Sequence, residues 1–181
     1  MLAFAASVGH ASQAATAAIT RQSTDSFDRL ALAQAANLDS VRGRNAAVQM
    51  QAAAQAILAA HDVLFLGLRG SFSTAYHLHY TCDWLRANTR LATDAGGAWA
   101  DQLLALTPGD LLVVVSQAPY TRQTVEAAQQ ACARGVPVLA LTDSSLSPLA
   151  RLAQHTLLFD AASPSFFHSM TGALALAEAL V

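Results

Sequence analysis

The fold is decided by one stretch, TPGDLLVVVS (Thr107–Ser116), in which a turn leads directly into an unbroken apolar run. The first four residues have the composition of a turn. The next six, Leu111–Ser116, have the length of a strand rather than a helix. A run without polar alternation is typical of a strand buried on both faces, as in a parallel sheet covered by helices. The stretch therefore predicts the central strand of an α/β fold.

Similar apolar runs flank this strand along the chain. They predict four further strands, over residues 62–67, 90–94, 137–142 and 155–160. The intervening segments predict helices over residues 73–88, 98–106, 121–134 and 148–154, followed by a terminal helix over residues 165–181. This alternation predicts a five-stranded parallel sheet sandwiched between helices, a flavodoxin-like three-layer α/β fold.

The chain changes character near Ala60. The sequence before it is rich in Ala and Gln and contains no convincing strand. Apolar spacing predicts an amphipathic helix over residues 25–38 and a second helix over residues 45–60, with Asn45 as its N-cap. We expect an N-terminal helical segment over residues 1–44 and an α/β domain over residues 45–181.

The composition excludes several mechanisms. Of 181 residues, 54% are hydrophobic and 12% are charged, and the net charge is -2. All ten basic residues are Arg, so the chain offers no lysine for a Schiff base, a phosphate-binding loop or a general base. Only Glu126 and Glu178 supply glutamate. The charge is also unlike that of a strongly basic nucleic-acid binder.

The sequence favours a cytoplasmic protein. No apolar run approaches the roughly 18 to 20 residues of a spanning helix, so we expect no membrane partner. The N-terminus lacks the positive region of a signal peptide. Cys82 and Cys132 lack metal-ligand spacing, which favours free thiols over a metal site. His77 and His79 lie two residues apart on a predicted helix and point to different sides, so they do not form a metal site either.

Ligands of open parallel sheets bind beyond the carboxyl ends of the strands. Two loops there are rich in hydroxyls and precede helices: GLRGSFST (Gly67–Thr74) and SQAPYTRQT (Ser116–Thr124). Helix N-termini attract anions such as phosphate. The candidate ligand-binding residues are Arg69, Gly70, Ser71, Ser73, Ser116, Tyr120, Thr121 and Thr124, with His168 as a further pocket residue.

Each candidate also has a structural interpretation. A Ser or Thr before a helix is most often only a cap. Arg69 is either a phosphate clamp or the partner of a salt bridge. His168 fits a cap or packing role as well as a pocket. GLRGSFS is not the dinucleotide fingerprint GxGxxG, and no GxSxG motif occurs, so we expect no cofactor.

These residues resemble a known family. Residues 45–181 resemble a SIS (sugar isomerase) domain and, more narrowly, the C-terminal effector domain of RpiR-family bacterial transcription regulators. The resemblance rests on four blocks: GLRGSFSTA, TPGDLLVVVS, TVEAAQQACARGVPVLALTDSSLSPLARLA and SPSFFHSMTGALALAEAL. It implies a five-stranded parallel sheet and a phosphosugar bound between the loops after the first and third strands.

The two loops depart from the family's usual pattern. In the third-loop pattern SxSGxTxE, Ser116 and Thr121 match, whereas Ala118, Pro119 and Gln123 replace the second Ser, the Gly and the Glu. In the first loop, Gly67 and Ser71 match and Arg69 replaces the second Gly. Ala118 removes a hydroxyl, and Pro119 removes a backbone N–H. Arg69 and Tyr120 add new groups, so the ligand is either a phosphosugar, a different sugar acid, or none.

We therefore expect a non-catalytic domain that senses a small anionic sugar derivative in an RpiR-type transcription regulator. One alternative is a SIS module used only for oligomerisation. The other is a phosphosugar isomerase, for which His168 is the best remaining base, but scarce glutamate favours a sensor over an enzyme.

The resemblance also bears on partners. RpiR-type regulators bind DNA through an N-terminal helix-turn-helix, and the sequence ahead of the first predicted strand is too short for a complete one plus a linking helix. Four Arg and three Asp precede His61, so this region has a net charge of only +1. Residues 1–44 are then either a remnant or linker of such a domain or a naturally shortened terminus, and DNA binding is expected of sequence not clearly present here. SIS domains pair through helices that border the pocket, which implies a homodimer or homotetramer.

Overall fold

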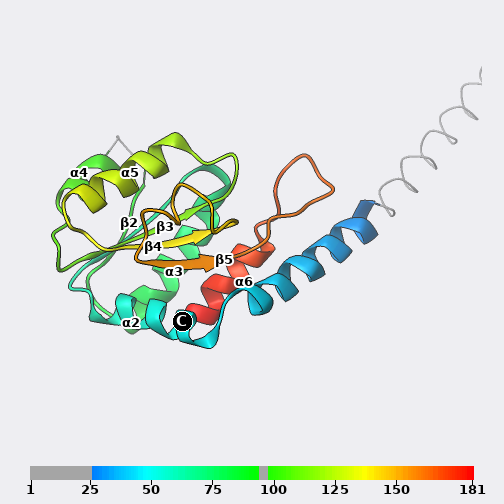
Figure 1. The fold of residues 1–181 in the computed structure, drawn as a ribbon, viewed down its shortest axis with the longest axis horizontal. Coiled ribbons are helices and arrows are strands. Elements are labelled where there is room, and N and C mark those ends of the chain that lie inside the picture. Colours follow the sequence, from blue (N-terminus) through cyan, green and yellow to red (C-terminus); the bar gives the residue numbers. More distant parts are fainter. Residues whose placement is uncertain (1–25, 94–97) are drawn as a thin grey trace, which may run out of the picture.

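The computed structural model describes residues 26–93 and 98–181, and it has the expected three layers (Figure 1). One all-parallel sheet has the strand order β2-β1-β3-β4-β5. Its strands are β1 (Val63–Gly67), β2 (Thr89–Leu91), β3 (Leu111–Ser116), β4 (Val138–Thr142) and β5 (His155–Leu158). The prediction of a five-stranded parallel sheet is confirmed. Strand order reverses between β1 and β3, which makes their carboxyl ends the switch point where ligands of such folds bind.

Helices cover both faces of the sheet. One face carries α2 (Ala47–Ala59), α3 (Phe72–Leu85) and α6 (Thr171–Leu180), and the other carries α4 (Trp99–Leu104) and α5 (Arg122–Ala133) (Figure 1). A short 3-10 helix, η1 (Arg69–Ser71), precedes α3. None of the helices within the described residues is long and apolar enough to span a bilayer.

The sheet separates two hydrophobic cores. Val63 and Phe65 of β1 belong to the core under α2, α3 and α6, whereas Leu64 and Leu66 belong to the core under α4 and α5. Successive side chains of a strand point to opposite faces, so each strand supplies both cores. Every residue of β1, β3 and β4 is buried. This double burial is why their sequences show no polar alternation.

The helix over residues 26–44 extends away from the sheet at one end and is docked at the other (Figure 1). The Asn37 side chain donates a hydrogen bond to the Ala162 carbonyl (2.8 Å). Arg44 forms an ion pair with Asp160 and donates to the Asp143 carbonyl (2.9 Å). The helix therefore continues past the predicted end at residue 38, because its last turns bind the region after β4 and β5. The predicted start at residue 25 lies outside the described residues.

Asn45 is not the cap of the second helix. The N-cap of α2 is Ala46, and α2 begins at Ala47. The Asn45 side chain instead accepts a hydrogen bond from the Leu158 amide and donates one to the Leu158 carbonyl, both at 2.7 Å. These bonds satisfy backbone groups of the edge strand β5.

Two predicted helices differ from the structure. Residues 148–154 form turns rather than a helix, because the Gln154 amide donates to the Val138 carbonyl (3.0 Å) and draws the chain straight into β5. The terminal helix begins at Thr171 rather than at residue 165. Residues 161–170 form a loop that closes where the Ser169 amide donates to the Ala161 carbonyl (3.2 Å). Strand 90–94 is shorter than predicted, and Asp94 lies outside the described residues.

Candidate functional site

A pocket of about 590 Å³ lies where the loops after β1, β3 and β5 meet. Six of the predicted residues line it: Arg69, Gly70, Ser71, Ser116, Thr121 and His168. Residues that were not predicted complete it: Leu68, Gln117, Ala118, Pro119, Phe166, Phe167 and Met170. The position matches the switch point between β1 and β3.

The loop after β1 depends on close backbone packing. A Cβ atom on Gly67 would lie 2.4 Å from the Ser71 carbonyl oxygen, so only glycine fits there. Arg69 has a φ of 56°, in the left-handed region that favours glycine. This explains why a glycine is usual at that position in the family that the sequence resembles. An arginine kept in this conformation costs about 1 kcal/mol, which points to a role for its side chain.

Two buried serines connect the loops after β1 and β3. The Ser71 hydroxyl donates a hydrogen bond to the Gln117 side-chain oxygen (2.9 Å). Ser116, at the end of β3, is only 2% exposed. No hydrogen bond to its hydroxyl is found within residues 26–93 and 98–181. Because Ser116 lines the pocket, its hydroxyl can donate a hydrogen bond to a ligand or accept one from it.

Arg69 is the arginine that lines the pocket of about 590 Å³, which we call the main pocket. Its exposed side chain lines the main pocket and two adjoining cavities of about 430 and 530 Å³. It forms no ion pair in the part of the chain that the structure describes. Of the two interpretations, a salt bridge is therefore not observed, and the guanidinium is available to an anion.

Asp143, which sequence reasoning missed, organises the loop after β3. Its carboxylate accepts hydrogen bonds from the Ala118 amide (3.2 Å) and the Tyr120 hydroxyl (2.9 Å). Burial, together with this bond to Asp143, raises the pKa of Tyr120 to about 12. Tyr120 lines an adjoining cavity rather than the main pocket. Asp143 could have been identified from the sequence by its position directly after β4, because the loops at the carboxyl ends of the strands bind ligands.

Two predicted residues lie off the pocket. The Ser73 hydroxyl donates to the Gly70 carbonyl (3.1 Å), a local bond at the start of α3. Thr124 is fully buried on α5, and its hydroxyl has no partner within the described residues. Neither lines the main pocket or the two cavities beside it. Their role in ligand binding stays a prediction.

The pocket's titratable groups are few. Arg69 and His168 are the only ones among its described lining residues, and no carboxylate is present there. Glu126 lines an adjoining cavity, where it pairs with Arg122 (2.7 Å). The arrangement can bind an anion through Arg69 and hydroxyls, and the His168 imidazole is the other titratable side chain among the described lining residues.

Phe166 and Phe167 form the apolar part of the wall. They are 92% and 75% exposed, and their ring centroids lie 4.8 Å apart in an edge-on pair. The sequence prediction placed them in the terminal helix, whereas the structure places them in the loop over residues 161–170. Apolar rings beside polar groups suit a ligand with both kinds of surface.

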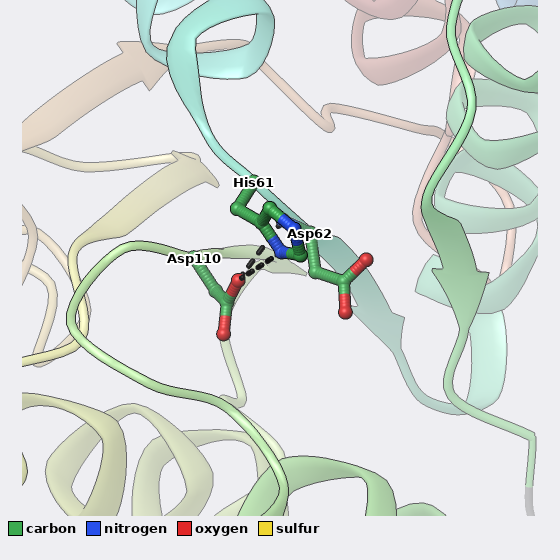
Figure 2. A group of neighbouring side chains, drawn as sticks. All are labelled: His61, Asp62 and Asp110. Carbon is green, nitrogen blue, oxygen red and sulfur yellow. Dashed lines mark hydrogen bonds and ion pairs between the residues drawn. The ribbon is translucent and has the colours of Figure 1, made fainter.

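A second polar cluster lies at the opposite edge of the sheet. Figure 2 shows His61, Asp62 and Asp110, whose ligand-type atoms lie within 4.8 Å of one another. The Asp110 carboxylate already accepts bonds from the Thr107 amide (2.7 Å), the Thr107 hydroxyl (2.8 Å) and the Asp62 amide (2.9 Å). Asp62 pairs with Arg90 (3.3 Å). Because the chain itself satisfies these carboxylates, we assign the cluster a structural role.

The comparisons with known proteins agree with this geometry. A family model for the SIS domain matches residues 56–181. The sugar isomerase domain of an RpiR transcription factor from Sphaerobacter thermophilus is 33% identical, with a TM-score of 0.80, over 83% of this chain and 84% of that chain. No match is found among curated proteins.

Two further structures are similar. The Vibrio vulnificus NanR protein complexed with ManNAc-6P is 25% identical, with a TM-score of 0.75, over 91% of this chain and 64% of that chain. An Escherichia coli CFT073 protein in complex with A5P has the same fold, at 14% identity and a TM-score of 0.68, over 85% of this chain and 87% of that one. From the family match and the shared architecture, the chain belongs to the SIS domain family.

Proposed function

We propose that this protein is the sensing domain of an RpiR-type transcription regulator and that it binds a phosphosugar or a sugar acid without transforming it. The observation that carries the proposal is the pocket at the β1–β3 switch point, where Arg69 and buried serines face an opening without carboxylates. An anion fits such a lining, because guanidinium and hydroxyl donors satisfy its oxygens.

Two relatives support the proposal, the first its regulatory part and the second its ligand-binding part. One is the domain of an RpiR transcription factor, and the other, NanR, is complexed with ManNAc-6P. This chain spans 64% of that NanR chain. We propose that DNA binding belongs to sequence beyond the SIS domain and that the protein acts in the cytoplasm.

Ligand binding is tested by thermal unfolding and calorimetric titration of the full chain. The probes are ManNAc-6P, unphosphorylated ManNAc, inorganic phosphate and a sugar acid. We expect a phosphorylated sugar or a sugar acid to raise the melting temperature, since a ligand stabilises the state that it binds. Failure of every anionic probe would favour the alternative of a SIS module used only for oligomerisation.

Serine variants locate the site. Ser116→Ala and Ser71→Ala should each weaken binding of the identified ligand by roughly fivefold or more, the value of about one hydrogen bond. Ser145→Ala is the matched control, because Ser145 is an exposed hydroxyl outside the pocket and should leave the affinity unchanged. Unchanged affinity in both pocket variants would show that the ligand binds elsewhere.

One observation favours a second function, a phosphosugar isomerase. His168 lines the pocket and could act as a general base toward a bound sugar. Incubation of each bound sugar phosphate with the protein, followed by product analysis, separates the two functions. Turnover that disappears in His168→Ala would replace the sensor proposal, whereas binding without turnover supports it.

A further inference from the structure

The last turns of the helix over residues 26–44 lie beside the end of β5 (Figure 1). Asn37 and Ser40 form hydrogen bonds to backbone groups of the two residues that lie two and four positions after this strand. Arg44, in the final turn, differs from them because it also reaches the residue that follows β4. The end of this helix is therefore attached to the ends of two neighbouring strands.

The Arg44 guanidinium bridges those two strand ends. One of its nitrogens forms an ion pair with the Asp160 carboxylate, and another donates a hydrogen bond to the Asp143 carbonyl (2.9 Å). A planar guanidinium has donors in a fixed fork and can bond to two acceptors at once. The side chain is half-buried, so water and salt screen these bonds less than they would on an open surface.

Asp143 extends this contact to the ligand region. Its carboxylate accepts hydrogen bonds from the Ala118 amide (3.2 Å) and the Tyr120 hydroxyl (2.9 Å). Ala118 lines the main pocket, and Tyr120 lines the adjoining cavity of about 530 Å³. Pro119, between them, has no N–H to donate. The Asp143 carboxylate therefore holds the part of the loop after β3 that forms the pocket wall.

The bond from Arg44 acts where the strand ladder ends. The last residue of β4 is Thr142, whose carbonyl accepts a hydrogen bond from the Phe159 amide (3.1 Å). Asp143 lies one residue beyond, so the guanidinium supplies the donor that a neighbouring strand would otherwise supply. The carbonyl and the carboxylate of Asp143 are attached to the same Cα atom, and a bond that fixes the first restrains the second.

We propose that Arg44 is a positioning residue of the ligand pocket, and that docking of the helix over residues 26–44 and ligand binding strengthen each other. Arg44 does not line the main pocket and acts through Asp143 on the loop after β3. Coupling between two binding events is reciprocal, so a ligand that binds better when the helix is docked must strengthen the docking. The inference rests on the proposed binding of a ligand in the main pocket.

The first test needs no ligand. Hydrogen exchange of the Ala118 amide is measured by NMR on the full chain, with the Ala128 amide inside α5 as the reference for general stability. We expect Arg44→Ala to speed exchange at Ala118, relative to Ala128, by about fivefold, the value of about one hydrogen bond. Arg42→Ala is the matched control, because Arg42 is an exposed arginine of the same helix and should change neither rate.

The second test separates positioning from stability. Arg44→Lys keeps a positive charge beside Asp160, but an ammonium lacks the fork that reaches Asp143 at the same time. We expect this variant to keep most of the wild-type melting temperature and to bind ManNAc-6P, or whichever anionic probe binds the wild type, about fivefold more weakly. Asp160→Asn is the converse variant. It removes the ion pair and leaves the bond to Asp143, so it should affect the melting temperature more than the affinity.

The third test measures the docking of the helix. The buried Asn37 side-chain amide donates to the Ala162 carbonyl, so the exchange of its protons reports how often this contact opens. A saturating concentration of the bound probe should slow this exchange in the wild type by a factor comparable to the affinity that Arg44→Lys loses. The same probe should slow it less in Arg44→Lys.

Faster exchange at Ala118 in Arg44→Ala, together with weaker binding by Arg44→Lys, supports the proposal. Equal changes at Ala118 and Ala128, or no difference between Arg44→Ala and Arg42→Ala, would overturn it whether or not a ligand is found. Unchanged affinity in Arg44→Lys would overturn the coupling even if Ala118 exchanges faster. If no anionic probe binds the wild type, the proposed function fails and the coupling fails with it, whereas the exchange of Ala118 still decides whether Arg44 holds the loop.

Discussion

The amino and carboxyl edges of the sheet both carry polar side chains. They differ in whether the protein itself supplies the hydrogen-bond partners of these side chains. At the amino edge, both oxygens of the buried Asp110 carboxylate accept hydrogen bonds from the turn before β3 and from the start of β1. At the carboxyl edge, Ser116 lines the pocket, and Arg69 stands in a left-handed conformation without an ion pair within the described residues.

This difference separates structural from binding groups. Buried polar groups are normally satisfied within the protein, and leaving one unsatisfied costs stability. Asp110 follows that rule, so its role is complete without a ligand. Arg69 is exposed and lines the pocket, and its left-handed backbone is a local strain of the kind expected where function is retained at the expense of local stability. Substitutions should therefore affect folding at one edge and binding at the other.

The largest effect is expected at the amino edge. Asp110→Ala removes the acceptor of three hydrogen bonds and leaves the Thr107 and Asp62 amides without a partner. We expect a loss of about 3 kcal/mol in the free energy of unfolding, measured by denaturant titration. Asp39→Ala is the control, because Asp39 is exposed on the helix over residues 26–44 and should change stability little. A stable Asp110→Ala protein with weakened ligand binding would reverse the assignment of the two edges.

Acid should reproduce part of this loss. Burial alone would raise the pKa of Asp110, but hydrogen bonds from Thr107 and Asp62 outweigh it and hold the pKa below its ordinary value of 3.8. A carboxyl whose pKa is lowered on folding adds stability that is present above the unfolded pKa and lost as pH falls through the folded one. Denaturation between pH 5 and about 2 should show this loss in the wild type and less of it in Asp110→Ala.

The central strands were predictable from the sequence because they are buried on both faces of the sheet. In β1, β3 and β4 every residue is buried, so unbroken apolar runs mark them within one residue of their ends. The edge strand β2 is half-buried and shorter than its pattern predicted. The helix predicted over residues 148–154 is absent because of a backbone bond to Val138, a contact between distant segments that local sequence does not encode.

The sequence predicted which loops form the candidate site. It did not predict the hydrogen bonds between those loops. Strand ends identified six pocket residues, since parallel strands bring their carboxyl ends to one edge. The bond from Tyr120 to Asp143 joins residues 23 positions apart, and Ser71 and Gln117 are 46 apart. Such pairings depend on strand order, which no single motif specifies. Phe166 and Phe167 were missed because the terminal helix was predicted to begin too early.

At the carboxyl edge, Arg69→Gly should separate binding from stability. Loss of the guanidinium should weaken an anionic ligand by about tenfold, the value of a charged hydrogen bond. Arg69→Ala should lose the same affinity but keep the left-handed φ of 56°. Glycine relieves that conformation, so Arg69→Gly should be about 1 kcal/mol more stable than Arg69→Ala. Equal stability of the two variants, measured by denaturant titration, would show that the loop relaxes to a different conformation.

The smallest effect is expected at Tyr120, a residue of the carboxyl edge whose hydrogen bond is made within the protein. Tyr120→Phe removes the hydrogen bond to Asp143 and should lower the free energy of unfolding by about 1 kcal/mol or less, since burial of the ring is kept. Burial and Asp143 raise the pKa of Tyr120 from 10.0 to about 12. Its contribution to stability is therefore present below pH 10 and lost as pH rises through the folded pKa.

An alkaline titration followed by tyrosinate absorbance isolates this group among the three tyrosines. The phase near pH 12 should disappear in Tyr120→Phe and persist in Tyr80→Phe, which keeps the bond to Asp143. If Tyr120→Phe also leaves ligand affinity unchanged, then Tyr120 belongs with Asp110 as a structural group, although it lies at the binding edge. Loss of affinity without loss of stability would place it with Arg69 instead. A residue's location at the carboxyl edge would then predict ligand binding better than whether its hydrogen bonds are satisfied within the protein.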